Sequence, residues 1–104
     1  MQDYQLACPV EDVSEGKMQL VEVDDRLVII VKIDGQYHCI DDVCTHDGGP
    51  LSDGELQGCQ ISCPRHGAQF DVTTGEALTM PATQATGCHE VKVEDGNLYV
   101  KIKD

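Results

Sequence analysis

Two short segments of the sequence, CTHDGGPL and ISCPRHGAQFD, each hold a cysteine and a histidine at close spacing. One residue separates the first pair, two separate the second, and sixteen lie between the pairs; the four residues are Cys44, His46, Cys63 and His66. Thiolates and imidazoles are ligands that zinc and iron accept in proteins. Glycine and proline in both segments are typical of tight loops. We therefore predict two loops that each bring one thiol and one imidazole to a common centre.

Three kinds of site fit two cysteines and two histidines. Structural zinc takes four such ligands, but the usual zinc finger supplies a Cys pair and a His pair, whereas each loop here mixes the two. A catalytic Cys–His pair would use one of each and leave the other pair idle. A [2Fe–2S] cluster with two Cys on one iron and two His on the other uses both mixed pairs symmetrically. The pattern favours the cluster, and zinc in the same ligands stays the alternative.

The two segments resemble the cluster-binding loops of Rieske proteins, and nearly the whole chain resembles a small bacterial Rieske-type ferredoxin in its flanking strands, length and turns. Such ferredoxins belong to bacterial aromatic-ring-hydroxylating dioxygenase systems. The resemblance implies one [2Fe–2S] cluster of the Rieske type, with Cys44 and Cys63 on a buried iron and His46 and His66 on an iron near the surface. It also suggests that Pro81, in TMPATQA, belongs to a third loop that covers the cluster.

The ligand set implies how such a centre would handle an electron. Two thiolates leave the oxidised cluster neutral, whereas four would leave it negative, so neutral imidazoles raise the reduction potential. Rieske proteins of respiratory chains join the loops by a disulfide, but Gly49 and Arg65 stand at the matching positions. Those proteins also use a Ser and a Tyr to donate hydrogen bonds to the cluster sulfurs, where this chain has Ala68 and Phe70. We therefore predict a potential in the lower part of the roughly −150 to +300 mV Rieske range.

The segments that must position these loops read as β-strands. Apolar and polar residues alternate with the period of a strand over residues 17–23, 27–33, 88–93 and 98–103, with brief strands at 59–62 and 69–72. The odd-numbered residues of 27–33 fall on one face. VDDR, IDGQ and EDGN mark tight hairpins, two of them through Asp-Gly. We expect an all-β fold, a small antiparallel β-sandwich or barrel with a loop-rich cluster-binding subdomain, as in Rieske iron–sulfur proteins. Residues 1–104 should form a single domain with a cluster-binding insert at about 41–87.

Composition narrows the class of protein further. The 104 residues carry a formal net charge of −12, which argues against nucleic acid and anionic lipid as partners. No segment approaches the roughly 20 apolar residues of a membrane helix. The N-terminus lacks a signal peptide pattern, so we expect a cytoplasmic protein. Its cysteines should then stay reduced.

The remaining cysteines and histidines call for simpler interpretations. Four cysteines lie in or beside expected strands and should be small buried apolar residues: Cys8, Cys39, Cys59 and Cys88. His38 and His89 are expected to be strand residues without function.

The functional hypothesis is a one-electron carrier that catalyses no reaction alone. By resemblance, a flavin-containing, NAD(P)H-dependent ferredoxin reductase would supply its electron and a terminal oxygenase would receive it. The acidic surface would favour encounter with basic patches on those partners, and the alternative is that the acidity simply keeps a small protein soluble. The alternative is a Rieske-like small subunit of a nitrite reductase or another oxidoreductase complex, which would co-purify with a large catalytic chain.

Overall fold

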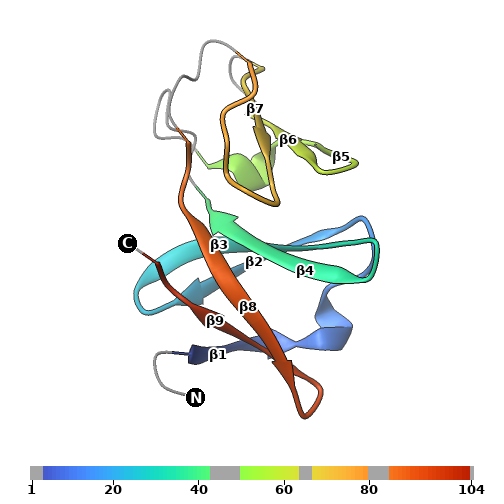
Figure 1. The fold of residues 1–104 in the computed structure, drawn as a ribbon, viewed down its shortest axis with the longest axis vertical. Helices are drawn as coiled ribbons and strands as arrows, with labels where there is room; N and C mark the ends of the chain where they lie inside the picture. Colours follow the sequence, from blue (N-terminus) through green and yellow to red (C-terminus); the bar gives the residue numbers. More distant parts are fainter. Residues whose placement is uncertain (1–3, 43–49, 64–66, 80–84, 104) are drawn as a thin grey trace.

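The computed structural model describes residues 4–42, 50–63, 67–79 and 85–103. It consists of a six-stranded antiparallel sheet in the order β1-β9-β8-β4-β3-β2 and a separate three-stranded sheet in the order β5-β6-β7. Figure 1 shows the small sheet above the curved large one, which is nearly closed into a barrel. The predicted all-β fold is confirmed. The described residues include no helix long and apolar enough to cross a membrane.

Strands β2 (Met18–Val23), β3 (Arg26–Ile33) and β4 (Gln36–Asp41) form an antiparallel meander. Its two turns, Asp24–Asp25 and Asp34–Gly35, have φ angles between 53° and 79°. Two-residue hairpin turns need this left-handed conformation because its twist matches that of the strands, and Asp and Gly tolerate it better than most residues. The hairpins predicted at VDDR and IDGQ are confirmed.

Three further strands complete the large sheet. β8 (Cys88–Glu94) and β9 (Asn97–Lys101) are joined by the predicted Asp-Gly turn, and β1 (Tyr4–Pro9) pairs with β9. A short 3₁₀ helix, η1 (Val10–Asp12), follows β1. Strand β8 also pairs with β4, which joins the two halves of the sheet.

Strand β3 lies between two hydrophobic clusters. Its residues Val28 and Ile30 face the barrel interior, together with Cys39, Leu98 and Val100. Its alternate residues face the small sheet, in a cluster made of Ile29, Val31, Ile40, Leu51, Ile61, Cys63, Ala68, Phe70 and Val72. We call this second group the upper cluster. The longest apolar run of the sequence is therefore buried on both faces.

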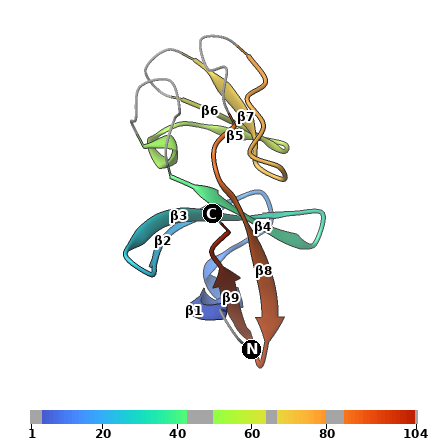
Figure 2. The ribbon, with the colours of Figure 1, turned by 60° about the vertical axis from the view of Figure 1, so that its left-hand side comes forward.

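The small sheet stands on the upper cluster. It contains β5 (Leu56–Gln57), β6 (Gln60–Ser62) and β7 (Gln69–Asp71), preceded by the 3₁₀ helix η2 (Leu51–Asp53). The chain enters this part after β4 and returns from it to β8, as the second view shows (Figure 2). The brief strands predicted at 59–62 and 69–72 are confirmed with slightly shorter bounds.

Candidate metal centre

Cys63 follows β6 directly, at the base of a short β-hairpin. Its backbone N–H donates to the carbonyl oxygen of Ala68 (2.7 Å), and the N–H of Gly67 donates to the carbonyl oxygen of Cys63 (3.0 Å). Gly67 has a φ of 74°, a conformation that favours glycine. Cys63 is only 2% exposed. The predicted ligand His66 lies outside the described residues, in the segment 64–66 that these two bonds bracket.

The first motif segment is also flanked on both sides by residues that hydrogen bonds hold together. Cys44 and His46 lie outside the described residues, in 43–49, and so does Gly49. On one side of this segment Asp42 is buried (6% exposed), and its carboxylate accepts hydrogen bonds from the backbone N–H (2.7 Å) and the hydroxyl (3.0 Å) of Ser52. This bracket ties the last described residue before the segment to the start of η2 just after it.

The hydrogen-bonded residues that flank each motif segment, which we call the motif brackets, pack around one buried core. Leu51 is fully buried and shares the upper cluster with Cys63 and Ala68. The residues that flank 43–49 and 64–66 therefore meet around one core, although the sequence separates the motifs by sixteen residues. This is the arrangement that a centre with ligands from both segments requires.

The predicted third loop has its own anchors in the small sheet. Pro81 lies outside the described residues, in 80–84. Just before it, the hydroxyl of Thr79 accepts a hydrogen bond from the N–H of Gln69 (3.0 Å) and Leu78 donates its N–H to the carbonyl oxygen of Gln69 (2.7 Å). Just after it, Thr86 donates its N–H to the carbonyl oxygen of Gly75 (2.8 Å). The anchor before the segment is therefore fixed to β7, and the anchor after it to the loop that follows β7.

The surroundings of Cys63 suit an iron–sulfur cluster. The cysteine lies in an apolar wall with Ala68 and Phe70, both fully buried and without a side-chain donor. Such a wall keeps water away from a sulfur ligand, and burial and hydrogen bonding around the sulfurs are among the factors that set the potential. Within the described ranges no group of three or more His, Cys, Asp or Glu could hold a metal ion. The donor present fits the cluster, and the other three predicted ligands lie in the segments that the brackets flank.

The other cysteines differ from the prediction at one position. All five cysteines in the described part of the chain are free. Cys8 and Cys39 are buried and Cys88 is half-buried, and burial is the main cause that raises the pKa of each of these three thiols. The prediction was wrong for Cys59, which is exposed because it occupies the two-residue turn between β5 and β6 rather than a strand.

One contact near the site was not predicted at all. His89 lies in strand β8, as expected, but its side chain is fully buried and its Nε2 lies 2.7 Å from Oδ1 of Asp41. Asp41 is the last residue of β4, just before the first motif segment. The two residues are 48 positions apart, so no local pattern could have indicated the pair.

Comparisons with known proteins identify the family to which the chain is similar. The family model described as Rieske [2Fe-2S] domain matches residues 3–99. The ferredoxin component of a naphthalene 1,2-dioxygenase system from Pseudomonas putida is 38% identical over 96 residues, which cover 92% of this chain and 90% of that protein. The ferredoxin component of the naphthalene 1,2-dioxygenase/salicylate 5-hydroxylase systems from a Ralstonia species is 35% identical over 97 residues, 93% of this chain and 92% of that protein. Among solved structures, a chain in the complex of reduced oxygenase and oxidised ferredoxin of carbazole 1,9a-dioxygenase has a TM-score of 0.88 and 33% identity, with coverage of 100% and 99%.

Proposed function

Because this chain belongs to the Rieske [2Fe-2S] family, we propose that it carries single electrons from a flavin-containing, NAD(P)H-dependent reductase to a terminal Rieske non-haem iron oxygenase in the cytoplasm. The two relatives described above are named as ferredoxin components of dioxygenase systems, and we infer for this chain the role of an electron carrier that is not itself a catalyst. One observation carries the proposal: the residues that flank both motif segments pack around the same core as buried Cys63.

The proposed ligands are the two mixed pairs. Cys44 and Cys63 would hold one iron, and His46 and His66 the other, within a single domain whose insert runs from about 41 to 87. When bound, the cluster takes up and releases one electron. The chain contributes a buried sulfur at Cys63, an apolar wall that excludes water, and loop ends that hydrogen bonds hold in place. Fixed ligands suit electron transfer because little must move when the charge changes.

The charge distribution supports encounter at the cluster end of the molecule. Within the proposed insert, residues 41–87, the sequence contains one Lys or Arg, which is Arg65, against seven Asp and Glu residues. The other six Lys and Arg residues come from the segments of the large sheet and its neighbours. An acidic cluster end would attract basic patches on a reductase or an oxygenase and raise the rate of encounter.

Spectroscopy of the purified protein tests this proposal. We expect a red-brown solution, uptake of one electron per chain in a dithionite titration, and a reduced electron paramagnetic resonance (EPR) signal of the mixed-ligand Rieske type. A colourless protein with bound zinc would overturn the proposal, as would the signal of a four-cysteine ferredoxin. Co-purification with a large catalytic chain would instead favour the small-subunit alternative.

A further inference from the structure

Two passages of the chain connect the small sheet with the large one. The outgoing passage leaves β4 at Asp41, and the returning passage enters β8 through Gly87 (Figures 1 and 2). They touch where the N–H of Asp41 donates to the carbonyl oxygen of Gly87 (2.8 Å). We call this point the neck. Its position matters because the segment with the proposed ligands Cys44 and His46 begins just beyond Asp41.

The backbone ladder at the neck is short. Strands β4 and β8 share two residue pairs, Cys39 with His89 and Ile40 with Cys88, whereas β3 and β4 share six. A ladder of two pairs gives little resistance to opening, because each backbone hydrogen bond makes only a small net contribution to stability. Side chains must therefore contribute if the neck is to keep one geometry.

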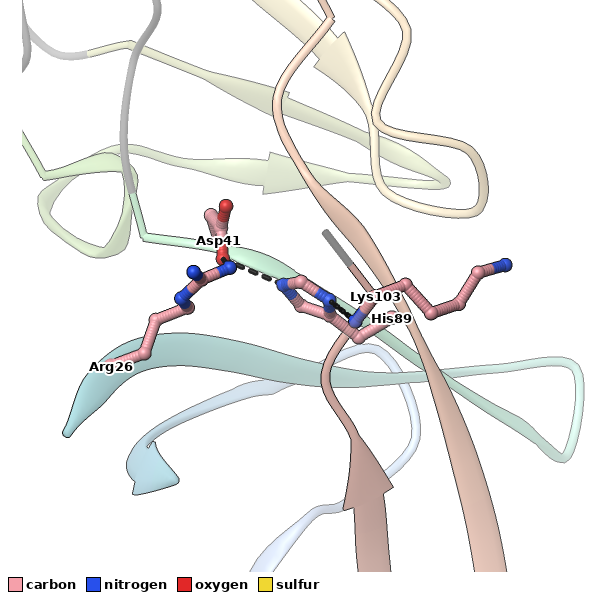
Figure 3. A network of polar contacts seen from close by, with 4 residues as sticks. All are labelled: Arg26, Asp41, His89 and Lys103. Atoms are coloured by element: carbon pink, nitrogen blue, oxygen red, sulfur yellow. Dashed lines mark hydrogen bonds and ion pairs between the residues drawn. The ribbon is translucent and has the colours of Figure 1, made fainter. Parts of the chain in front are cut away.

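A polar network of side chains crosses the neck (Figure 3). Nε2 of His89 lies 2.7 Å from Oδ1 of Asp41, and Nδ1 of His89 accepts the backbone N–H of Lys103 at 3.0 Å. Because Nδ1 is an acceptor, the ring proton sits on Nε2 and His89 donates to the carboxylate. Arg26 approaches the same carboxylate oxygen at 3.8 Å. The network thus joins β3, β4, β8 and the backbone after β9.

The neck is also shaped to hold that carboxylate. A Cβ atom placed on Gly87 would overlap Oδ2 of Asp41, so any larger residue would displace the side chain that His89 contacts. The His89 side chain is completely buried, whereas 22% of the Asp41 side chain is exposed, so it is the imidazole that has no access to water in place of this bond. Breaking such a bond leaves a buried polar group unpaired, which is more costly than losing an exposed bond.

We propose that Asp41 and His89 are positioning residues for electron transfer, a clasp that holds the neck closed and so fixes the loop that carries Cys44 and His46. This inference rests on the ligand set proposed above. The clasp acts on the loop through the last residues of β4. Its loss should let the loop sample several geometries and release the cluster more readily.

Four variants test the clasp, each measured as the complete cluster-loaded chain. His89→Leu removes both hydrogen bonds, and Gly87→Ala displaces the Asp41 side chain without deleting a polar group. His89→Gln can donate to Asp41 and accept from Lys103, so it should rescue. Glu15→Ala is the matched control, because the Glu15 carboxylate also accepts two hydrogen bonds, from the N–H groups of Asp34 (2.6 Å) and Gly35 (3.0 Å), but at the other end of β4.

The readouts are the rate at which visible absorbance bleaches with a chelator and the linewidth of the reduced EPR signal. We expect His89→Leu and Gly87→Ala to lose the cluster at least about tenfold faster than wild type, the factor for one buried bond to a charged group, with broader EPR lines. His89→Gln and Glu15→Ala should stay close to wild type in both. Where His89→Leu does not accumulate as folded protein, Gly87→Ala carries the test.

Two results overturn the inference. One is cluster loss and linewidth at wild-type values in Gly87→Ala and His89→Leu. The other is an equal effect of Glu15→Ala, which would mean that general destabilisation releases the cluster. A wild-type protein without a mixed-ligand EPR signal would instead overturn the ligand set, and the inference with it, so the two failures are distinguishable.

Discussion

A serine at position 68 should raise the reduction potential of this protein. Ala68 is fully buried and lies opposite Cys63, and the backbone N–H of Cys63 donates to the carbonyl oxygen of Ala68 (2.7 Å). Side chains of directly opposite residues have Cβ atoms about 4.5 to 5.5 Å apart, which places a serine hydroxyl within reach of the Cys63 sulfur. Sulfur gains negative charge on reduction, so a donated hydrogen bond stabilises the reduced state more than the oxidised one.

The size of the effect follows from ordinary hydrogen-bond energies. A net contribution of about 0.5 to 1.5 kcal/mol corresponds to a rise of about 20 to 65 mV, since a tenfold change in equilibrium for one electron is about 59 mV. Phe70→Tyr should act in the same direction where its hydroxyl reaches a sulfur, because Phe70 is fully buried in the same cluster. The two wild-type residues are thus the basis for the predicted potential in the lower part of the Rieske range.

Protein-film voltammetry on Ala68→Ser and on a matched control measures this shift. Val72→Thr is the control, because it also adds a hydroxyl to a buried position of the upper cluster. Val72 lies four residues further along the chain, just beyond the end of β7, and four residues of extended chain span about 13 Å at 3.3 Å per residue. The control should lower stability without moving the potential. An unchanged or lower potential in Ala68→Ser, with the cluster intact, would refute the reasoning.

Three further outcomes are expected. His66→Ala should lose the mixed-ligand EPR signal, while His38→Ala, at a half-buried position of β4, should keep it; retention in both would exclude His66 as a ligand. Raising the salt concentration from about 0.1 M to about 1 M shortens the screening length from about 10 Å to about 3 Å, so reduction by the reductase should slow, and an unchanged rate would contradict electrostatic attraction. Hydrogen bonds from the N–H groups of Gly35 and Asp34 hold the pKa of Glu15 below its ordinary value of 4.5. A lowered folded pKa gives stability that is present above the unfolded value and lost as pH falls through the folded one. The unfolding midpoints of wild type and Glu15→Gln should therefore differ at neutral pH and converge on acidification, and a constant difference would contradict this account.

The sequence predicted the strands in which apolar and polar side chains alternate and which are joined by turns with characteristic residues such as Asp-Gly. β3 and β9 belong to this group, and Asp-Gly turns mark the hairpins β3–β4 and β8–β9. Strand β1 was not predicted, since its register shifts between Leu6 and Cys8 and the irregularity breaks the alternation. β4 shows a similar problem, because the consecutive residues Cys39 and Ile40 are both buried, on opposite faces of the sheet.

In the candidate site, too, the features set by neighbouring residues could be predicted, whereas contacts between residues far apart in the sequence could not. The spacing of cysteine and histidine is local, so the ligand set could be proposed from the sequence, and the structure adds the burial of Cys63 and the brackets on either side. The bond from Ser52 to Asp42 and the clasp of Asp41 with His89 join residues 10 and 48 positions apart. Their polar side chains look like ordinary strand or turn residues until the fold brings them together.

The apolar run LVIIV shows how the insert is attached to the rest of the protein. Its odd-numbered residues share a face as predicted, but Ile29 and Val31 are fully buried while Leu27 is 52% exposed. The buried pair is covered by Leu51 and Phe70 of the insert, whereas Leu27 lies at the β2–β3 turn end. In a plain barrel this face would be open to water, so the small sheet is held in place by burying it. Close-packed interiors deform little, so the motif brackets, which pack against the same core as β3, should move little. The strand that stabilises the fold therefore also limits movement at the proposed electron-transfer site.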